Sequence, residues 1–430
     1  MHKFKSPAIA LIFSLVAIAP AMATPWHDFG PRAMSMGGAG VAIAQGPDAV
    51  FYNPAALSHL DNASGFAVNV GARGEFTGSV IQGANDLNKL NDSCSKLDAA
   101  NCTTAKINEA FDHLGQAGNG AQVDVAGAMT FKFKRLAFFA LNETYLGASP
   151  ELDRTVGVLG SELTNNQSKL VLRGGMFNEF GVGYGRELGE TGLILGGNLK
   201  LISGKVGYHE LRVVAEDSDS IDKFKDDAKT SLQPAADLGV LWDVKKTFEG
   251  ALGRPKLGLV ARNINNPTFK QPDAARTSGE RDRFSLHGQM RAGASISPFN
   301  FWHLAADMDL TENVSYIDGY KSRYMGLGTE VNVFNRSWIN IPLRAGLKKN
   351  LSDTASGLAY TAGFGLNLAH VMIDVGGQMS AKTTTLQSER ESKKIPNNFA
   401  GGVRIAVLFG GGEKAKPLAA EEVAPSAKPE

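Results

Sequence analysis

The 430-residue sequence predicts an all-β fold: a transmembrane up-and-down antiparallel β-barrel of about 14 strands, preceded by an N-terminal plug segment. The first observation is that the chain after residue 65 consists of amphipathic, strand-like runs of roughly 9–13 residues. The second is that the connections between these runs alternate, long then short, along the chain. Outer-membrane barrels have tight turns on one rim and longer loops on the other, whereas a soluble sandwich has no reason to sort its loops.

The connections set the strand count. The long ones fall near 79–120, 146–176, 206–233, 265–283, 311–321, 350–356 and 381–397. The short ones fall at 132–135, 188–191, 245–254, 297–300, 335–337 and 369–370. This alternation implies an even number of strands between 66 and 409, with both chain ends on the periplasmic side.

Residues 1–23 have the pattern of a signal peptide. His2, Lys3 and Lys5 give a positive start, an apolar run follows to Ala19, and small residues end at Ala23. The apolar run is too short for a retained membrane anchor, which needs about 20 such residues. We therefore expect cleavage near Ala23 and export to the outer membrane of a Gram-negative cell envelope.

Composition excludes several classes of protein. No apolar run of 18 residues follows residue 23, so we expect no membrane-spanning helix. The 44 basic and 43 acidic residues nearly balance, so the sequence lacks the excess of basic residues that is typical of nucleic-acid-binding proteins. Many of the 49 glycines lie within strand runs, where they weaken an ordinary strand. On the inner wall of a barrel they make room for a plug or a ligand.

The last strand shows the alternation most clearly. Phe399, Val403 and Ile405 fall on one face, and Arg404 falls on the other, toward the lumen. The strand closes on Phe409, an aromatic end of the kind that the barrel-insertion machinery recognises, which makes that machinery an expected partner. Residues 410–430, rich in Ala, Pro, Lys and Glu, are predicted to form a disordered periplasmic tail.

Neighbouring strands project charges into the same lumen. The predicted inward residues are Arg291, Asp307, Asp309, Glu330 and Arg344. Opposite charges on adjacent strands would form a salt-bridge ladder that stiffens the wall. The alternative is a polar site that orients the head group of a substrate. His287 and His303 share the inward face and are expected to serve as hydrogen-bonding groups.

Two loops carry candidate sites of other kinds. Cys94 and Cys102 lie in the first long loop and predict one local disulfide in an oxidising compartment. The alternative, a zinc site, lacks the remaining ligands. The acidic run in the loop 206–233 suggests Ca²⁺, but it lacks the glycine and the closing Glu of an EF-hand, which favours a solvated loop. We expect no metal and no cofactor.

Residues 24–65 do not alternate and are predicted to fold into the barrel mouth as the plug. A small, apolar stretch from Met36 to Ala44 precedes the run from Phe51 to Leu57. The glycines Gly38 and Gly40 do not form a dinucleotide-binding loop, because no third glycine, preceding strand or βαβ unit accompanies them.

These plug residues carry a family resemblance. The stretch from Arg32 to Ala42, leading to Phe51–Leu57, resembles the N-terminal signature of the FadL-like outer-membrane barrels, which are long-chain fatty-acid and hydrocarbon transporters and their relatives. Weaker matches at 258–267, 304–311 and 343–347 are similar to the branch described as conjugal transfer protein TraF. The resemblance implies a fourteen-stranded barrel with an N-terminal hatch, in which Asn53 and Pro54 would gate a lateral route for apolar ligands.

Two functions follow as hypotheses. The first is passive uptake of hydrophobic molecules, such as long-chain fatty acids or hydrocarbons, by a barrel surrounded by outer-membrane lipid. The candidate pocket residues are Val41, Ile43, Phe51, Tyr52, Asn53 and Pro54, although each could equally be plug core. The second is a non-transporting structural component linked to conjugal transfer or surface export. None of the eight histidines has the spacing of a catalytic triad, so we do not expect an enzyme.

Overall fold

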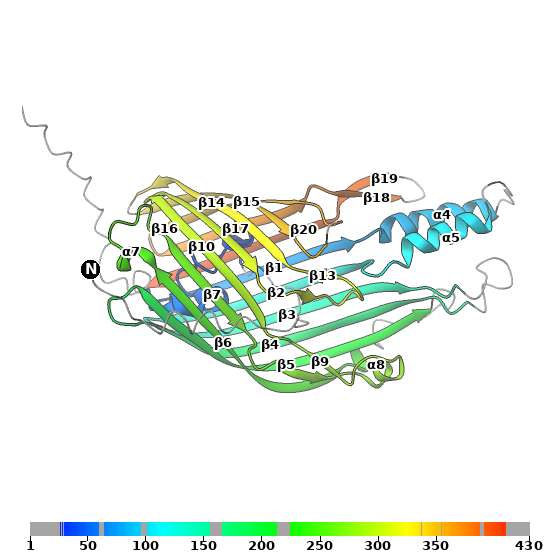
Figure 1. Cartoon of the computed structure of the whole chain (residues 1–430), viewed down its shortest axis with the longest axis horizontal. Coiled ribbons are helices and arrows are strands. Elements are labelled where there is room, and N and C mark those ends of the chain that lie inside the picture. Colours follow the sequence, from blue (N-terminus) through cyan, green and yellow to red (C-terminus); the bar gives the residue numbers. More distant parts are fainter. Residues whose placement is uncertain are drawn as a thin grey trace, which may run out of the picture.

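A computed structural model describes residues 26, 28, 30–59, 64–95, 100, 102–154, 166–212, 224–336, 338–353, 355–387 and 391–409. Fourteen strands pair antiparallel, each with the next, and β20 returns to pair with β1, which closes the barrel (Figure 1). The strands are β1 (Ser64–Thr77), β2 (Gly120–Phe133), β3 (Leu136–Glu151), β4 (Lys169–Glu187), β5 (Leu193–Arg212), β6 (Lys229–Asp243), β7 (Lys256–Arg262), β10 (Gln289–Phe299), β11 (Trp302–Asp309), β14 (Tyr324–Asn335), β15 (Ile339–Asn350), β16 (Ala359–Leu368), β17 (Val371–Ser380) and β20 (Asn398–Phe409).

The predicted barrel of about 14 strands is confirmed. The predicted ends of three strands are wrong, because positions 146, 176 and 206 lie inside β3, β4 and β5, which are 16, 19 and 20 residues long. These strands continue beyond the expected apolar band since their inward side chains, such as Tyr145 and Val206, still find packing partners among the loops.

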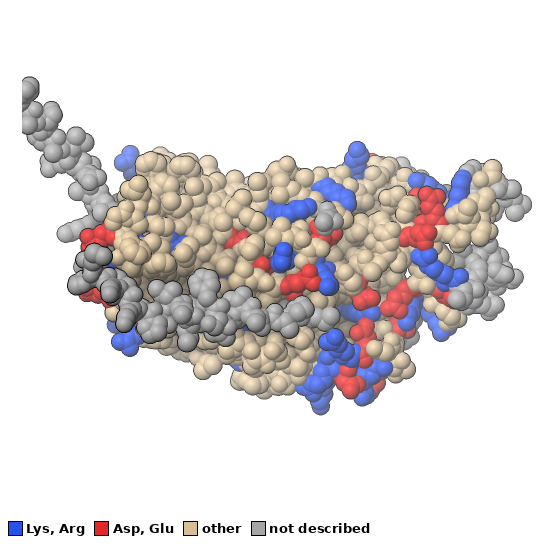
Figure 2. Space-filling model, in the orientation of Figure 1, with Lys and Arg blue, Asp and Glu red and all other residues tan. Residues whose placement is uncertain are grey.

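Outward and inward side chains differ sharply in exposure. On β20, Ile405 is 52% exposed, whereas its neighbour Arg404 is 7% exposed and faces the lumen. Large apolar side chains such as Phe138, Phe180 and Phe364 are exposed on the outside of other strands. Figure 2 shows few charged residues over the left part of the visible face, several near its middle, and most of them gathered toward the end with helices α4 and α5. The outer surface of the barrel is therefore apolar.

The long connections carry their own small elements. The first holds α4 (Val80–Ser95) and α5 (Thr104–Leu114), which project beyond the barrel (Figure 1). The others hold β8 (Thr268–Lys270), α8 (Asp273–Thr277), β9 (Arg283–Ser285), β12 (Asn313–Val314), β13 (Lys321–Ser322), β18 (Thr383–Gln387) and β19 (Ser392–Pro396). One short connection holds α7 (Val244–Thr247). Within the described ranges, no helix is both long and apolar enough to cross a membrane.

Residues 30–59, called the inner segment below, lie inside the barrel. They form α2 (Pro31–Met34), α3 (Ala49–Tyr52) and the 3₁₀ helix η1 (Pro54–Ser58). Asn53 caps η1, since its side-chain oxygen accepts the N–H of Ala55 at 3.1 Å. Gly37 and Gly38 adopt positive φ angles of 69° and 86°, which turn the chain sharply after α2.

Wall glycines make room for the inner segment. At each of eleven wall positions a Cβ atom would lie within 3 Å of an atom of this segment. These positions are Gly183, Gly185, Gly196, Gly239, Gly258, Gly293, Gly326, Gly328, Gly346, Gly363 and Gly376. The segment follows the wall backward, from Pro31 against β17 to Pro54 against β6, β5 and β4. The inner segment therefore packs directly on the wall backbone.

Candidate functional site in the barrel lumen

A continuous chain of charges lines one side of the lumen. Four strands of this side place Glu330 on β14, Arg344 on β15, Asp374 on β17 and Arg404 on β20, all facing inward, and β16 lies between β15 and β17. Arg344 donates to Glu330 at 2.6 Å and to Asp374 at 2.7 Å. Arg404 donates to the other oxygen of Asp374 at 3.1 Å.

Both ends of this chain of charges lie on the inner segment. Arg32 of α2 donates to Glu330 at 2.8 Å and 2.9 Å, and Arg404 pairs with Asp48 before α3. Each of the wall charges thus has two opposite partners, the arrangement that compensates the desolvation of buried ions. We name these six residues the charge chain; they are Arg32, Glu330, Arg344, Asp374, Arg404 and Asp48.

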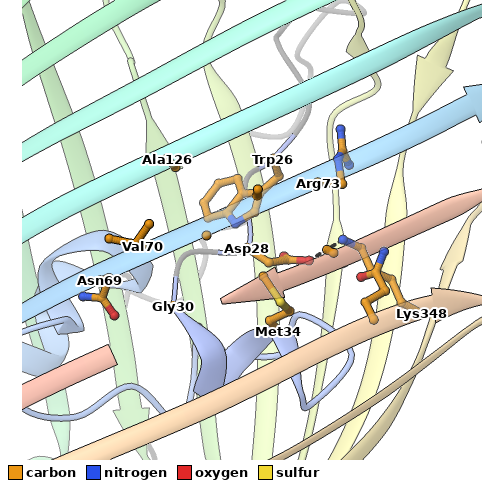
Figure 3. A pocket seen from close by; sticks show the side chains of 13 residues that line it. Trp26, Asp28, Gly30, Met34, Asn69, Val70, Arg73, Ala126 and Lys348 are labelled. Atoms are coloured by element: carbon orange, nitrogen blue, oxygen red, sulfur yellow. Dashed lines mark hydrogen bonds and ion pairs between the residues drawn. The ribbon is translucent and has the colours of Figure 1, made fainter. Parts of the chain in front are cut away.

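A second cluster anchors the start of the described chain. The Arg291 guanidinium pairs with Asp309 at 2.6 Å and with Asp28 at 3.3 Å, and it lies 4.4 Å from the centre of the Trp26 ring. Asp28 also pairs with Lys348. Figure 3 shows Trp26, Asp28 and Lys348 around a cavity of about 30 Å³ beside β1.

The structure places the five predicted lumen charges in different roles. Arg344 pairs with Glu330 and Arg291 pairs with Asp309, each across neighbouring strands. Asp307 instead accepts the backbone N–H groups of Gly40 and Val41 at 2.8 Å and 2.9 Å, and therefore holds the inner segment.

The two histidines that sequence analysis singled out lie apart. The Nδ1 atom of His303 lies 2.7 Å from the hydroxyl of Ser297. His287 lies before β10, where burial lowers the pKa of its ring below the ordinary value and favours the neutral form.

A third cluster was missed by sequence reasoning. Lys200 on β5 pairs with Glu179 at 3.0 Å and with Asp237 at 3.2 Å, and Asn198 donates to Asp237. All lie on the inward face, so the same period-two alternation that identified the other charges could have found them. Their position next to the inner segment could not be predicted, because it depends on the path of that segment; Asn198 also donates to the Val50 carbonyl.

A cavity of about 400 Å³ separates part of the inner segment from the wall. All six residues of the charge chain line it, together with amide side chains near the short turns. Apolar side chains, among them Ile43, Pro342, Met372 and Leu408, also contribute to the lining. The cavity is therefore amphipathic.

The six predicted pocket residues divide into two groups. Ile43 and Tyr52 line the cavity. Phe51 packs edge-on against Phe139 at 5.5 Å. Val41 packs with Trp26 and Val260.

Asn53 and Pro54 are tied to the wall rather than to the cavity. Asn53 donates to the carbonyls of Val41 and Val240 at 3.2 Å and 2.9 Å. A Cβ atom at Gly239 would meet both Asn53 and Pro54, so this part of the segment has no free space beside the wall.

Aromatic rings fill the lumen on the long-loop side. Tyr145 and Phe177 come from the wall, Phe269 and Phe284 from the β8–β9 hairpin, and Tyr316 from the loop between β12 and β13. Phe284 stacks on Tyr316 at 5.4 Å, and Phe177 meets Phe269 edge-on at 5.2 Å. Loop residues thus close this side against the wall.

Two loop predictions remain predictions. The side chain of Cys94 is outside the described residues, so the pairing of Cys94 with Cys102 is not tested. The core of the acidic run in the loop 206–233 falls at 213–223, also outside them. Among the residues that the structure describes, no group of three or more His, Cys, Asp or Glu side chains could hold a metal ion.

Solved structures of similar fold are outer-membrane-type channels. The chain is similar to a TodX monoaromatic hydrocarbon channel deltaS2 mutant, with 10% identity over 90% of this chain and 100% of that chain, and a TM-score of 0.51. It is also similar to the Ralstonia pickettii toluene transporter TbuX, with 13% identity, 89% and 98% coverage and a TM-score of 0.48. At these identities the likeness shows the fold alone.

A further likeness is to a Pseudomonas aeruginosa FadL homologue, with 10% identity, 91% and 99% coverage and a TM-score of 0.45. No curated protein matches the sequence. A family model described as "F plasmid transfer operon, TraF, protein" matches residues 50–309. Because this match spans more than half of the chain and agrees with the resemblance in the sequence, the chain belongs to the F plasmid transfer operon TraF protein family, with a FadL-like barrel fold.

Proposed function

We propose that this protein is an outer-membrane barrel that passes hydrophobic or amphipathic molecules, such as long-chain fatty acids, passively through its lumen. The observation that carries the proposal is the cavity of about 400 Å³ between the inner segment and the wall. Ligand sites typically measure about 300–1,000 Å³ and combine apolar surface with a few polar groups. The apolar outer surface supports the membrane location, and the signal-like start supports export with cleavage near Ala23.

A neighbour in fold supports the same class of cargo. The TodX structure described above is that of a monoaromatic hydrocarbon channel. For this chain the inner segment would act as the hatch, with Ile43 and Tyr52 facing the passing molecule.

Equilibrium binding of a labelled long-chain fatty acid to outer-membrane vesicles, with and without this protein, tests the proposal. We expect saturable binding that is lost in the variant Ile43→Asp, because a carboxylate in the cavity would meet the apolar chain of the ligand. The control is Gln116→Asp, in an exposed loop on the opposite side of the barrel. Absence of saturable binding, with the barrel shown to be folded, would overturn the proposal.

A second function is favoured by the family match. The family description refers to a plasmid transfer operon, and the charge chain fixes the inner segment to the wall as a structural barrel would require. In this case the barrel would serve conjugal transfer or surface export without passing a ligand. Loss of plasmid transfer on deletion of the gene, in cells whose fatty-acid binding is unchanged, would favour this function over the first.

A further inference from the structure

We propose that the cavity beside the inner segment binds an uncharged, hydroxyl-bearing head group of an amphipathic molecule. This inference rests on the proposed passage of such molecules and adds which head group the site takes.

The cavity lies at the short-turn end of the barrel. Its lining includes Asn300 from the turn between β10 and β11, and Ala369 from the turn between β16 and β17. Asn332 near the end of β14 and Asn340 near the start of β15 lie at the same rim. A molecule that crosses the barrel therefore meets this cavity next to the rim that carries the short turns.

The charges that line the cavity are balanced. Three guanidinium groups, those of Arg32, Arg344 and Arg404, alternate with three carboxylates, and every one is already paired. A carboxylate or ammonium ligand finds no unpaired counter-charge in this lining and would compete with an existing pair, so it should bind more weakly than an uncharged ligand. An uncharged ligand meets no such penalty.

Amide groups supply the hydrogen bonds that such a ligand needs. Gln45, Asn300 and Asn332 line the cavity, the first two of them exposed to solvent, and their side chains make no hydrogen bond within the part of the chain that the structure describes. Asn367 donates to Asn340 at 3.1 Å at the same rim. An amide both donates and accepts, as a hydroxyl does, so free amides suit a hydroxylated partner of no charge.

The apolar part of the lining fits the remainder of the ligand. Ile43 and Met372 face the cavity from the inner segment and from β17, and Leu408 faces it from β20. A short alkyl stretch next to the head group can therefore be buried while the head group contacts the amides. The lining thus suits a glycerol or sugar ester better than a free fatty acid.

Binding of a matched ligand series to the full-length protein in lipid nanodiscs tests the inference. The probes are labelled glycerol monolaurate, laurate and dodecyltrimethylammonium, which have alkyl chains of similar length and uncharged, anionic and cationic head groups. We expect glycerol monolaurate to bind about tenfold more tightly than either charged probe.

Substitution of the amides tests the site itself. The double variant Asn300→Ala/Asn332→Ala removes two free amides without touching the charge chain, so it should raise the Kd for glycerol monolaurate about tenfold and leave that for laurate unchanged. The matched control is Gln116→Ala, an exposed amide on the long-loop side. Folding of each variant is checked by its heat-dependent mobility on gels.

Each outcome separates this inference from the proposed function. Equal affinity for the three probes, or tighter binding of a charged one, would overturn the head-group inference and leave passage of amphiphiles intact. An unchanged Kd for glycerol monolaurate in the double variant would also overturn it. Absence of binding by all three probes to folded protein would overturn the proposed function together with the inference.

Discussion

Gly346 on β15 lies directly against the backbone of Met36 and Gly37 in the inner segment. A methyl group there would approach the Gly37 nitrogen to 2.5 Å and the Leu327 carbonyl oxygen to 2.6 Å, and neither backbone atom can move aside easily. Gly401 on β20 is a contrasting case, because a methyl group at that position would find its nearest neighbour 4.0 Å away.

These two glycines give a matched test of the fit between wall and inner segment. We expect Gly346→Ala to destabilise the folded protein by about 1–3 kcal/mol through overpacking. Gly401→Ala should be neutral or slightly stabilising, because it lowers the entropy of the unfolded chain. Urea unfolding in lipid vesicles, followed by tryptophan fluorescence, measures both. Equal stability of the two variants would show that the inner segment is not fitted to the wall as described.

The charge chain is the feature that matters at the scale of strands. Because Glu330 binds Arg32 as well as Arg344, and Arg344 binds Asp374 as well as Glu330, no pair within it is independent. The exposed pair of Lys246 and Glu187 near the short turns is a contrasting, isolated interaction at 2.7 Å.

Charge reversal distinguishes a network from a set of separate pairs. Arg344→Glu should destabilise the protein by about 3–5 kcal/mol, because it buries unpaired carboxylates. The exchange Glu330→Arg/Arg344→Glu should fail to restore stability, since Arg32 and Asp374 would then face like charges. The matched exchange Lys246→Glu/Glu187→Lys should change stability by less than about 1 kcal/mol. Recovery of full stability by the first exchange, in urea unfolding, would refute the network.

The loop hairpins close the opposite side of the lumen with aromatic rings. The double variant Phe284→Ala/Tyr316→Ala removes the stacked pair that joins the β8–β9 hairpin to the loop between β12 and β13. We expect a higher single-channel conductance in planar lipid bilayers. The control is Phe301→Ala, which removes a ring stacked on Phe299 at 5.4 Å at the other rim. Unchanged conductance in the double variant would mean that these rings do not close the lumen.

Strand count and inward charge could be predicted because both follow from local alternation. The loop positions matched the structure at most strand ends, and inward residues such as Arg344 and Asp309 stood out against apolar neighbours. The ends of β3 to β5 could not be predicted, because those strands continue only where loop residues such as Phe269 pack against them. The helices α4 and α5 were likewise not expected within the first long loop.

The site was less predictable than the fold. The partners of the wall charges, Asp28, Arg32 and Asp48, lie some 250 to 360 residues away in the sequence, on a segment without periodicity. Nothing local indicates which wall residue each would meet. The sequence grouped the candidate pocket residues on one segment, but only the path of the inner segment separates Ile43 and Tyr52, at the cavity, from Phe51 and Asn53 in the packing.

At the scale of the whole molecule, β20 ends at Phe409 with both edges paired, to β1 and to β17. The barrel therefore closes without residues 410–430, which were predicted to be a disordered tail and lie outside the described residues. We expect deletion of 410–430 to leave both folding and heat stability unchanged, measured by gel mobility of the heated and unheated protein. Failure of the truncated chain to insert would show that the tail contributes to assembly.

The backward course of the inner segment along the wall constrains the order of folding. Ser35 accepts a hydrogen bond from Thr361, and Arg32 reaches Glu330, across 326 and 298 residues of sequence. Contacts between residues so far apart in the sequence form slowly, because the entropy cost of closing a long loop comes before the contact can stabilise the fold. The start of the inner segment therefore cannot make these contacts until β14 to β17 have formed. The contacts of Arg32 and Ser35 with the wall are therefore expected to form late in folding, after those of Pro54 with β4 to β6.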